Sequence, residues 1–149
     1  MNMGLFSTLE ISGSALAAER ARAEIVAANM ANAETTRTPQ GGPFRRKMAV
    51  FSGAGAAGFR LLLAGYSRLA GRGAGTVRLT NVVEDTTPAV MRYEPGHPDA
   101  DPSGFVAYPN VNPIQEMVDL MGAVRAYQLN ASAVTASKQM IQQSLDILK

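Results

Sequence analysis

Residues 112–149 read NPIQEMVDLMGAVRAYQLNASAVTASKQMIQQSLDILK, and this stretch decides the fold. Asn112 supplies an N-cap for a helix, and Pro113 supplies a preset first turn. Beyond them, nearly all of the residues that recur at alternating steps of three and four are apolar, which is a heptad pattern sustained for more than four heptads. The pattern predicts a single helix of about 36 residues, roughly 54 Å long. Its repeating positions are Met117, Leu120, Val124, Tyr127, Ala131, Val134, Lys138, Ile141, Leu145 and Leu148.

The other faces of this helix carry few charges. Between Ala126 and Leu145 the only charged residue is Lys138, whereas a helix on the surface of a soluble monomer carries Lys, Glu and Arg on its outward side. Serine, threonine, asparagine and glutamine fill those positions instead. Small and amide side chains suit close approach between helices, so we expect several neighbouring helices around this one, more than a chain of 149 residues supplies. The alternative is a coiled-coil dimer with a polar outer face.

A second, weaker heptad pattern occupies the amino terminus. Six of its eight positions are apolar or alanine, and the charged residues of the segment are concentrated in its middle. Pro39 disfavours a helical conformation at Thr38, and turn-forming residues precede it, so the predicted helix ends close to Asn32. We expect the two terminal helices to pair antiparallel and to leave further apolar faces for other subunits. The heptad positions are Leu5, Leu9, Ser12, Leu16, Glu19, Ala23, Val26 and Met30.

The middle of the chain has the composition of short strands and turns. Alternating apolar residues predict strands over residues 43–51, 76–83, 89–93 and 105–108, with turn signals between them. Residues 52–75 are rich in glycine and alanine and fit either a short helix between loops or a mobile insertion. The predicted fold class is α+β, with two long terminal α-helices forming a coiled-coil-like pair and a small β-rich middle module. The predicted domains are residues 1–32 together with 112–149, and residues 33–111 with an insertion at 52–75.

Composition excludes several classes of protein. The net charge of +2 and the charged fraction of 17% do not give the dense basic face that nucleic-acid binding needs. No cysteine is present, which removes disulfides, thiol chemistry and thiolate metal sites. The first basic residue is Arg20, and no apolar run approaches the roughly 18 residues of a membrane span. We therefore expect neither a secretory signal peptide nor a membrane-crossing helix.

A glycine motif and a histidine loop are the two candidates for chemistry. Residues 53–58, GAGAAG, match the dinucleotide-binding fingerprint, with Glu84 at the position of the ribose-binding acid. Residues 43–111 have room for one such unit at most, so a plain Gly/Ala-rich loop is favoured. His97, Asp99 and Asp101 alternate in a loop and are a candidate metal or acid/base site. Three nearby prolines and the lack of a second histidine favour instead a loop whose aspartates bond its own backbone or a neighbouring subunit.

The only basic run is Arg45-Arg46-Lys47. Its side chains fit contact with phosphate, but three charges without interleaved aromatic residues are more typical of a solvated strand edge. No Ser/His/Asp or Cys/His set can be assembled, because the single histidine lies far in sequence from any activated nucleophile. The sequence therefore gives no positive argument for an enzyme, a cofactor or a metal.

Several motifs resemble the bacterial flagellar rod and hook proteins. ANMANAETTRTP at residues 28–39, followed by GGPFRRK at residues 41–47, is similar to the Asn-Leu-Ala-Asn-Ala-x-Thr-Thr signature of that family. VED at residues 83–85, YEPGHPDAD at 93–101, GFVAYPNVN at 104–112 and RAY at 125–127 resemble its proximal rod subunits in particular. The resemblance covers both ends and most of the middle of the chain, and it departs only at about residues 52–75.

The resemblance implies an axial structural protein of the flagellar basal body, in the rod that crosses the periplasm. Such a protein is exported uncleaved by the flagellar type III apparatus, polymerises helically with copies of itself and other rod proteins, and transmits torque from motor to hook. Components of the MS ring or an adaptor at the rod base are further expected partners, whereas nucleic acid and cofactors are not. In the tube, the paired terminal helices line the inner wall and the β module faces outward. The alternative function is a soluble coiled-coil adaptor or secretion chaperone.

Packing of the terminal helices then predicts an assembly interface. Each large apolar side chain buried within or between subunits contributes roughly 1.5 to 3 kcal/mol. Asn29 and Asn32 share a helix face, where we expect them to end the first helix and to bond a neighbour. The predicted interface comprises Leu5, Leu9, Leu16, Val26, Asn29, Met30, Asn32, Met117, Leu120, Val124, Tyr127, Asn130, Val134, Ile141, Leu145 and Leu148.

Overall fold

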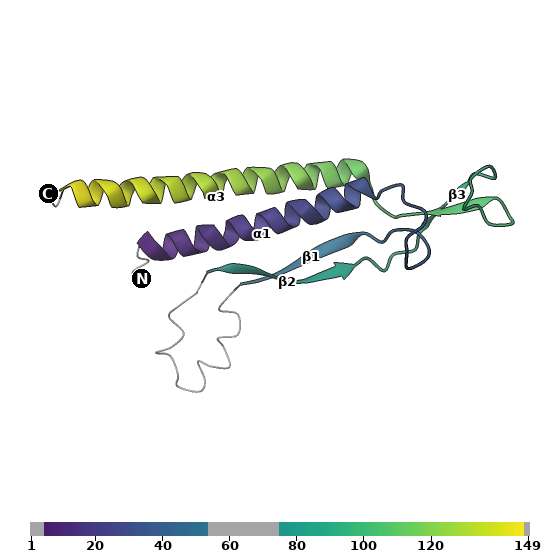
Figure 1. Ribbon diagram of the computed structural model, residues 1–149, viewed down its shortest axis with the longest axis horizontal. Helices are drawn as coiled ribbons and strands as arrows, with labels where there is room; N and C mark the ends of the chain where they lie inside the picture. The colour runs from purple at the N-terminus through teal and green to yellow at the C-terminus, as the bar shows by residue number, and fades with distance from the viewer. Residues whose placement is uncertain (1–4, 54–74, 148–149) are drawn as a thin grey trace, which may run out of the picture.

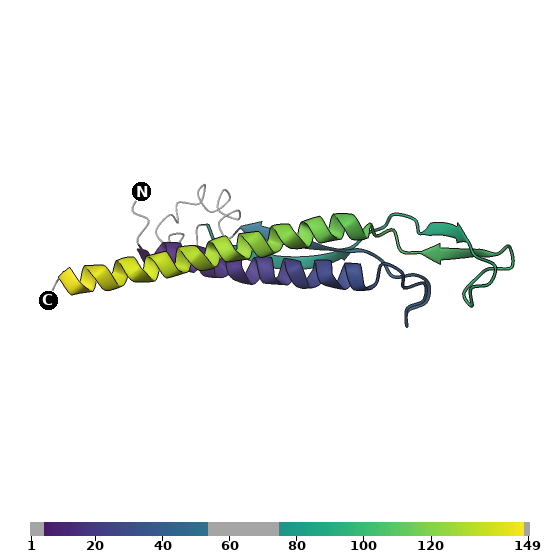
Figure 2. The same cartoon turned by 90° about the horizontal axis from the view of Figure 1, so that it is seen from above.

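The computed structural model describes residues 5–53 and 75–147. Two long helices lie side by side and antiparallel, and two strand pairs extend the molecule beyond and beside them (Figures 1 and 2). This arrangement confirms the predicted α+β class with paired terminal helices. In chain order the elements are α1 (Leu5–Ala31), β1 (Lys47–Gly53), β2 (Val77–Glu84), β3 (Val90–Tyr93), β4 (Phe105–Tyr108) and α3 (Pro113–Ile147).

The inner ends of both helices are capped as the sequence predicts. Oδ1 of Asn112 accepts hydrogen bonds from the backbone N–H groups of Ile114 at 3.0 Å and Gln115 at 3.4 Å, which satisfies two donors in the first turn of α3. At the end of α1, the backbone N–H of Asn32 bonds the carbonyl oxygens of Ala28 and Asn29. These two caps bring the connections to the strands to the same end of the helix pair. At the opposite end, α3 runs past the start of α1 (Figure 1).

The most deeply buried residues of the two paired helices are mostly small or polar, and most of the large apolar heptad residues of α3 are only half-buried or exposed. Ala18 and Val26 of α1 are buried, as are Ala123 and Ser137 of α3. Alanine and serine allow two helix backbones to approach closely, so this pair is tight but buries few large side chains. Most of the apolar surface of α3 is therefore left for contacts outside the chain.

The four strands form two separate antiparallel pairs. β1 and β2 pair from Lys47 with Glu84 to Gly53 with Val77, with a register shift between Val50 and Phe51, and this pair lies along α1. β3 and β4 pair from residue 90 with 108 to residue 93 with 105, and they project beyond the capped helix ends (Figures 1 and 2). The molecule is consequently long and thin, with a strand pair at one end and the bare end of α3 at the other.

Residues 54–74 lie outside the described residues, and most of the glycine motif falls among them. For this segment neither a short helix between loops nor a mobile insertion is tested. Gly53, the first glycine of that motif, ends β1. β1 pairs antiparallel with β2, whereas a dinucleotide-binding unit needs a parallel β-α-β arrangement. Among the described residues, neither helix combines the length and the hydropathy that crossing a bilayer requires.

Candidate assembly interface

Three separated segments of the chain meet around the side chain of Asn29, near the end of α1. This side chain is 1% exposed. Its Nδ2 donates to the carbonyl oxygen of Lys47 at 2.8 Å and to Oε2 of Glu116 at 3.1 Å. Its Oδ1 accepts from the backbone N–H of Lys47 at 2.8 Å. Because an amide both donates and accepts, one residue satisfies the backbone at the start of β1 and a carboxylate at the start of α3.

A row of alternating charges continues from this amide. Nε of Arg46 donates to Oε1 of Glu116, and Nη2 of Arg46 lies 3.7 Å from Oδ2 of Asp119. Oδ1 of Asp119 lies 3.6 Å from Nη2 of Arg22 on α1. The Glu116 side chain is 1% exposed and that of Arg46 is 27% exposed, so the carboxylate depends on its partners for charge compensation. We call Arg22, Asn29, Arg46, Glu116 and Asp119 the junction cluster.

The junction cluster fixes the position at which β1 leaves the helix pair, because α1, β1 with its preceding residue, and α3 all contribute to it. The sequence places Arg46 in a solvated basic run, and for this residue that interpretation is wrong. Arg45 and Lys47 are exposed, whereas Arg46 points to the opposite side of the strand and pairs with α3. The sequence did contain a signal for this difference, because side chains alternate along a strand and Arg46 therefore lies on the opposite face from Arg45 and Lys47. Nothing in the sequence pointed to Glu116, because its arginine partner is 70 residues away.

α3 keeps much of its apolar surface outside the helix pair. Met117, Val124, Tyr127 and Leu145, all predicted interface positions, are exposed, while Leu120, Val134 and Ile141 are half-buried. The side that meets α1 is centred about one residue away, at Glu116, Ala123 and Ser137. The large exposed residues define what we call the outer face of α3. They are Ile114, Met117, Val118, Met121, Val124, Tyr127, Leu129, Met140 and Leu145.

The remaining predicted interface residues lie mainly inside the chain. Val26 and Asn29 are buried, and Leu9, Leu16 and Met30 are half-buried. Nδ2 of Asn32 donates to the carbonyl oxygen of Ala28 at 2.8 Å, and Nδ2 of Asn130 donates to that of Ala126 at 2.9 Å. Leu5 begins α1 and Leu148 lies outside the described residues. Their roles in assembly stay predictions, because these contacts are within one chain.

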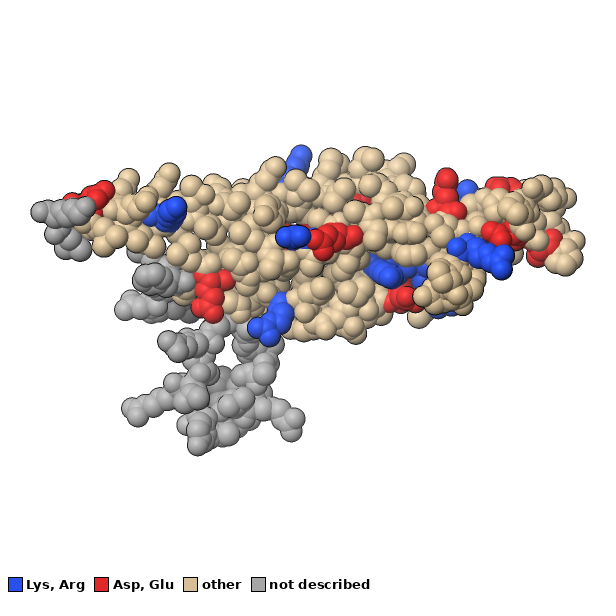
Figure 3. All heavy atoms as spheres, viewed as in Figure 1, with Lys and Arg blue, Asp and Glu red and all other residues tan. Residues whose placement is uncertain are grey.

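Charge is unevenly distributed over the molecule. On the face shown in Figure 3, charged side chains gather toward the end that carries β3 and β4, and long uncharged stretches follow α3. The ion pair between Arg20 and Glu24 on α1 is exposed and joins neighbouring turns of one helix, so it contributes little to stability. An exposed apolar helix face with so few charges is typical of a surface that other protein covers.

The histidine loop is held by hydrogen bonds within itself and to the segment that follows α1. Nδ1 of His97 accepts from the backbone N–H of Asp99 at 3.1 Å, and Oδ2 of Asp99 accepts from the hydroxyl of Thr36 at 2.8 Å. Oδ1 of Asp101 accepts from the backbone N–H groups of Ser103 and Phe105. The prediction that these aspartates bond the loop's own backbone is confirmed for Asp101. Within the described residues, no three His, Cys, Asp or Glu side chains gather as metal ligands would.

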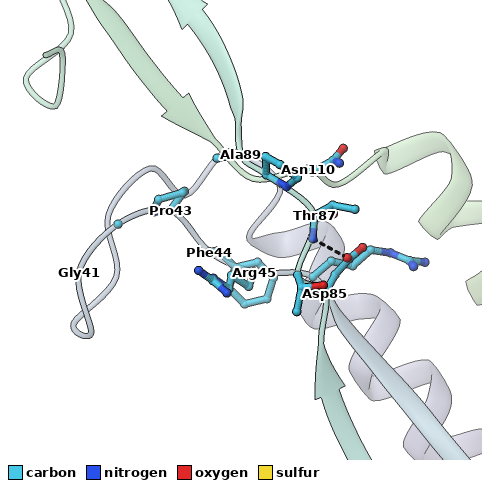
Figure 4. A pocket seen from close by; sticks show the side chains of 12 residues that line it. Gly41, Pro43, Phe44, Arg45, Asp85, Thr87, Ala89 and Asn110 are labelled. Atoms are coloured by element: carbon cyan, nitrogen blue, oxygen red, sulfur yellow. Dashed lines mark hydrogen bonds between the residues drawn. The ribbon is translucent and has the colours of Figure 1, made fainter.

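A hollow of about 230 Å³ lies where the loop after α1 meets the connection from β2 to β3 (Figure 4). Phe44, Arg45, Asp85 and Asn110 are among the residues that line it. A hydrogen bond from the backbone of Thr87 lowers the pKa of Asp85, as expected for a carboxylate that caps a turn. The lining residues come from the loop after α1, the connection between β2 and β3, and the segment after β4, so the hollow lies at the joint between the two strand pairs.

A second titratable group is perturbed in the β3–β4 pair. The hydroxyl of Tyr108 donates to Oε2 of Glu94 at 2.8 Å, and this hydrogen bond raises the pKa of Tyr108. Arg92 lies over the Tyr108 ring, 4.5 Å from its centroid. These contacts tie the two strands together without presenting a reactive group to a substrate.

Comparison with known proteins gives a consistent result at both ends of the chain. Residues 9–37 match the family model described as flagella basal body rod protein. Residues 103–147 match the model described as flagellar basal body rod FlgEFG protein C-terminal. These two segments contain most of α1 and all of α3, the elements that form the helix pair.

Curated relatives match over almost the whole chain. The flagellar basal-body rod protein FlgC of Borreliella burgdorferi is 37% identical over 153 aligned residues, covering 99% of both chains. FlgC of Bacillus subtilis is 37% identical and covers 99% of this chain and 100% of the relative. FlgC of Salmonella typhimurium is 37% identical and covers 97% of this chain and 98% of the relative.

Proposed function

Because this chain belongs to the FlgC family of flagellar basal-body rod proteins, we propose that it polymerises helically in the proximal rod and carries torque from motor to hook. It is a structural subunit of the rod, and its family is not one of enzymes. Transmission of torque then depends on packing: many contacts in parallel around the rod axis resist twisting and bending. No bond has to be made or broken.

The outer face of α3 is the observation that carries this proposal. It leaves large apolar residues such as Met117, Val124 and Leu145 in water, although a lone chain gains nothing from exposing them. Because about half of each side chain is already covered, each contributes roughly 1 kcal/mol more when a neighbouring subunit covers the rest. The paired helices would form the inner wall of the tube, and the strand pairs would face outward.

The partners follow from the same premise. Copies of this chain and other rod proteins would cover the outer face of α3, and components of the MS ring or an adaptor would meet the subunits at the rod base. The flagellar type III apparatus would export the chain uncleaved to the rod in the periplasm. Membership in a rod family supports assembly with rod proteins. The MS-ring or adaptor components and the export apparatus are further parts of the proposal.

The test is deletion of residues 140–149 in a flagellated bacterium that carries this chain in place of its own copy. Isolated basal bodies would be analysed for the chain, and motility would be measured in soft agar. The end of α3 runs past the described start of α1 (Figure 1). We expect loss of incorporation and of motility, because this end would have its contacts with other subunits. A motile deletion strain would contradict the proposal.

The matched control replaces the exposed residues Gln142 and Gln143 with alanine in the full-length chain. This change keeps the helix and its apolar residues, so incorporation should be retained. A full-length chain that remained a small discrete oligomer and never entered basal bodies would indicate a soluble adaptor or secretion chaperone instead.

A further inference from the structure

Both sides of α3 are open along its length. Among the described elements it packs only against α1, and it lies along the outside of the molecule (Figures 1 and 2). One side carries a row of residues spaced by seven, which therefore lie above one another on the helix surface. We call this row the first flank. It consists of Met117, Val124, Ala131, Lys138 and Leu145.

An apolar groove opens beside the first flank, between α3 and α1. Its volume is about 340 Å³, which is ample for a side chain, since a cavity of about 150 Å³ already holds a benzene ring. Val124 belongs both to this groove and to the first flank. The residues that line the groove are Glu19, Arg20 and Ala23 of α1 and Ala123, Val124 and Tyr127 of α3.

A second flank of α3 carries a large apolar side chain among small ones. It consists of two neighbouring rows, which are Gly122, Leu129, Ala136 and Gln143, and Arg125, Ser132, Gln139 and Asp146. Leu129 is 72% exposed, and it lies five residues from Val124, or about 140° around the helix. One copy therefore presents the groove on one side and Leu129 on another.

Each flank also carries an unpaired charge of opposite sign. Lys138 on the first flank and Asp146 on the second are exposed, and neither forms an ion pair with any residue that the structure describes. They are eight residues apart, or about 12 Å along α3, whereas side chains on one helix meet when they are three or four residues apart. Lys138 and Asp146 are thus too far apart to pair within one chain, but they can pair between two.

A single shift brings both complementary sets together. If a second α3 lies parallel to the first and is shifted along it by eight residues, Asp146 of the second copy reaches Lys138 of the first. The same shift places Leu129 of the second copy level with Met121 of the first, within one turn of Val124 at the groove. Because the two α3 helices are parallel, both copies point in the same direction, as a directional polymer requires.

The other helix of a neighbouring copy fits the groove less well. The exposed residues of α1 are small or charged, and none of those that the structure describes is a large apolar residue that could fill the groove. They are Glu10, Gly13, Ala17, Arg20, Glu24, Ala27, Ala28 and Ala31. The complementary surface is therefore the second flank of α3.

We propose that the second flank of α3 in one copy docks against the first flank of α3 in a second copy of this chain, in parallel and shifted by about eight residues. Leu129 enters the groove beside Ala23 and Val124, and Asp146 accepts a hydrogen bond from Nζ of Lys138. Because the two flanks differ, the contact is heterologous and continues from copy to copy rather than closing as a dimer. The contact rests on the proposed rod function and names the element, the direction and the register in which two subunits meet.

Cysteine cross-linking tests the register, because the chain has no cysteine of its own. Ala131→Cys and Gln139→Cys, eight residues apart on the two flanks, are expressed together in the flagellated host, and isolated basal bodies are oxidised. We expect a disulfide-linked dimer from the mixture and none from either variant alone. The doubly substituted chain should give a ladder of oligomers, because positions about 12 Å apart on one helix cannot form a disulfide within the chain.

Gln128→Cys is the matched control for this experiment. Gln128 is an exposed glutamine of α3 like Gln139, but in the proposed register it lies about 16 Å along the helix from Ala131 of the neighbour. It should give no dimer with Ala131→Cys. A cross-link as strong with Gln128→Cys as with Gln139→Cys would overturn the proposed register.

A charge exchange tests the ion pair independently. Lys138→Glu and Asp146→Lys each place like charges together, so each should lower the amount of chain in basal bodies about tenfold. The double variant restores opposite charges and should recover most of that loss. A double variant as poor as the single variants would overturn the pairing of Lys138 with Asp146.

The unaltered chain separates the two possible failures. Its absence from basal bodies would overturn the proposed rod function and this contact together. Incorporation into basal bodies without a cross-link between positions 131 and 139 would overturn the contact between α3 helices alone.

Discussion

The amide of Asn29 ties together three segments of the chain that are far apart in the sequence. It makes three hydrogen bonds, two of them to the backbone of Lys47 and one to Glu116. The segments it joins are far apart in the sequence, so its loss is not repaired locally. Asn32, by contrast, makes only local side-chain bonds, since its Nδ2 donates to the carbonyl oxygen of Ala28 and its Oδ1 accepts from the hydroxyl of Thr35.

Asn29→Ala should therefore lower the free energy of unfolding by about 1–3 kcal/mol, because a backbone N–H and a buried carboxylate oxygen lose their partner. The measurement is urea unfolding of the full chain followed by circular dichroism. Asn32→Ala is the matched control, with an expected loss below about 1 kcal/mol, since the freed carbonyl at the helix end is reached by water. Equal losses would contradict this view of Asn29.

The ion pair between Arg46 and Glu116 should respond unequally to removal of its two members. Arg46→Met leaves a buried carboxylate with only Asn29 as donor, and we expect a loss of about 3 kcal/mol. Glu116→Met should cost less, because Arg46 is partly exposed and keeps Asp119 at 3.7 Å. The double variant should cost less than Arg46→Met alone, which urea unfolding of all three proteins measures as a coupling energy. A larger loss for Glu116→Met would show that the arginine is the dependent partner.

At the scale of the elements, the β3–β4 pair is closed by a glycine that no other residue can replace without strain. Gly104 has a φ of +81°, and a Cβ atom there would lie 2.8 Å from Cε2 of Tyr93. The Tyr93 ring is itself held edge-on against Phe105 at a centroid separation of 5.3 Å. The turn and the aromatic pair therefore constrain each other.

Gly104→Ala should destabilise this strand pair by about 1–2 kcal/mol or more, from the left-handed backbone and the displaced ring. Hydrogen exchange at the amides of β4 reports the effect locally. Gly96→Ala, in the same loop and with open space around it, should change exchange little. Slow, unchanged exchange in Gly104→Ala would mean that the ring and the turn yield without cost.

Most element boundaries were predictable because the chain signals them locally, although the strand predicted over residues 43–51 is β1 at Lys47–Gly53. Asn112 with Pro113 starts α3 where expected, and the predicted strand over residues 105–108 coincides with β4. The side of α3 that faces α1 was not predictable in the same way. Its apolar arc is wider than one partner helix can cover, so the heptad spacing identifies the arc but not the part that faces α1.

The same limit explains the junction cluster and the buried oxygen of Glu19. A glutamate in the first turn of a helix suggests a favourable interaction with the helix dipole, and only the three-dimensional fold brings Arg46 to Glu116. Glu19 fell at a heptad position of the amino-terminal helix, where it read as an interruption of the apolar pattern. Its buried, partnerless oxygen becomes visible only when α3 lies beside it.

At the scale of the whole molecule, stability and assembly depend on different sides of α3. The side that meets α1 is small and polar, and the outer face is large and apolar. Substitutions on the outer face should therefore leave the folded chain almost unchanged while removing contacts between copies. In a repeating assembly every copy loses the same contacts, so the stability of the polymer falls by much more than the energy of one contact.

The triple variant Met117→Ser, Val124→Ser, Leu145→Ser tests this separation. We expect its free energy of unfolding to change by less than about 0.5 kcal/mol per site, because all three side chains are exposed in the single chain. Incorporation into basal bodies should be lost, since covering the exposed half of each side chain would contribute roughly 1 kcal/mol, and every copy in the rod loses three such contributions. The control Gln128→Ser, Gln139→Ser, Gln143→Ser changes three exposed polar residues of the same helix and matches the helix propensity of serine. If both triple variants entered basal bodies equally well, the outer face of α3 would not be the surface on which the rod is built.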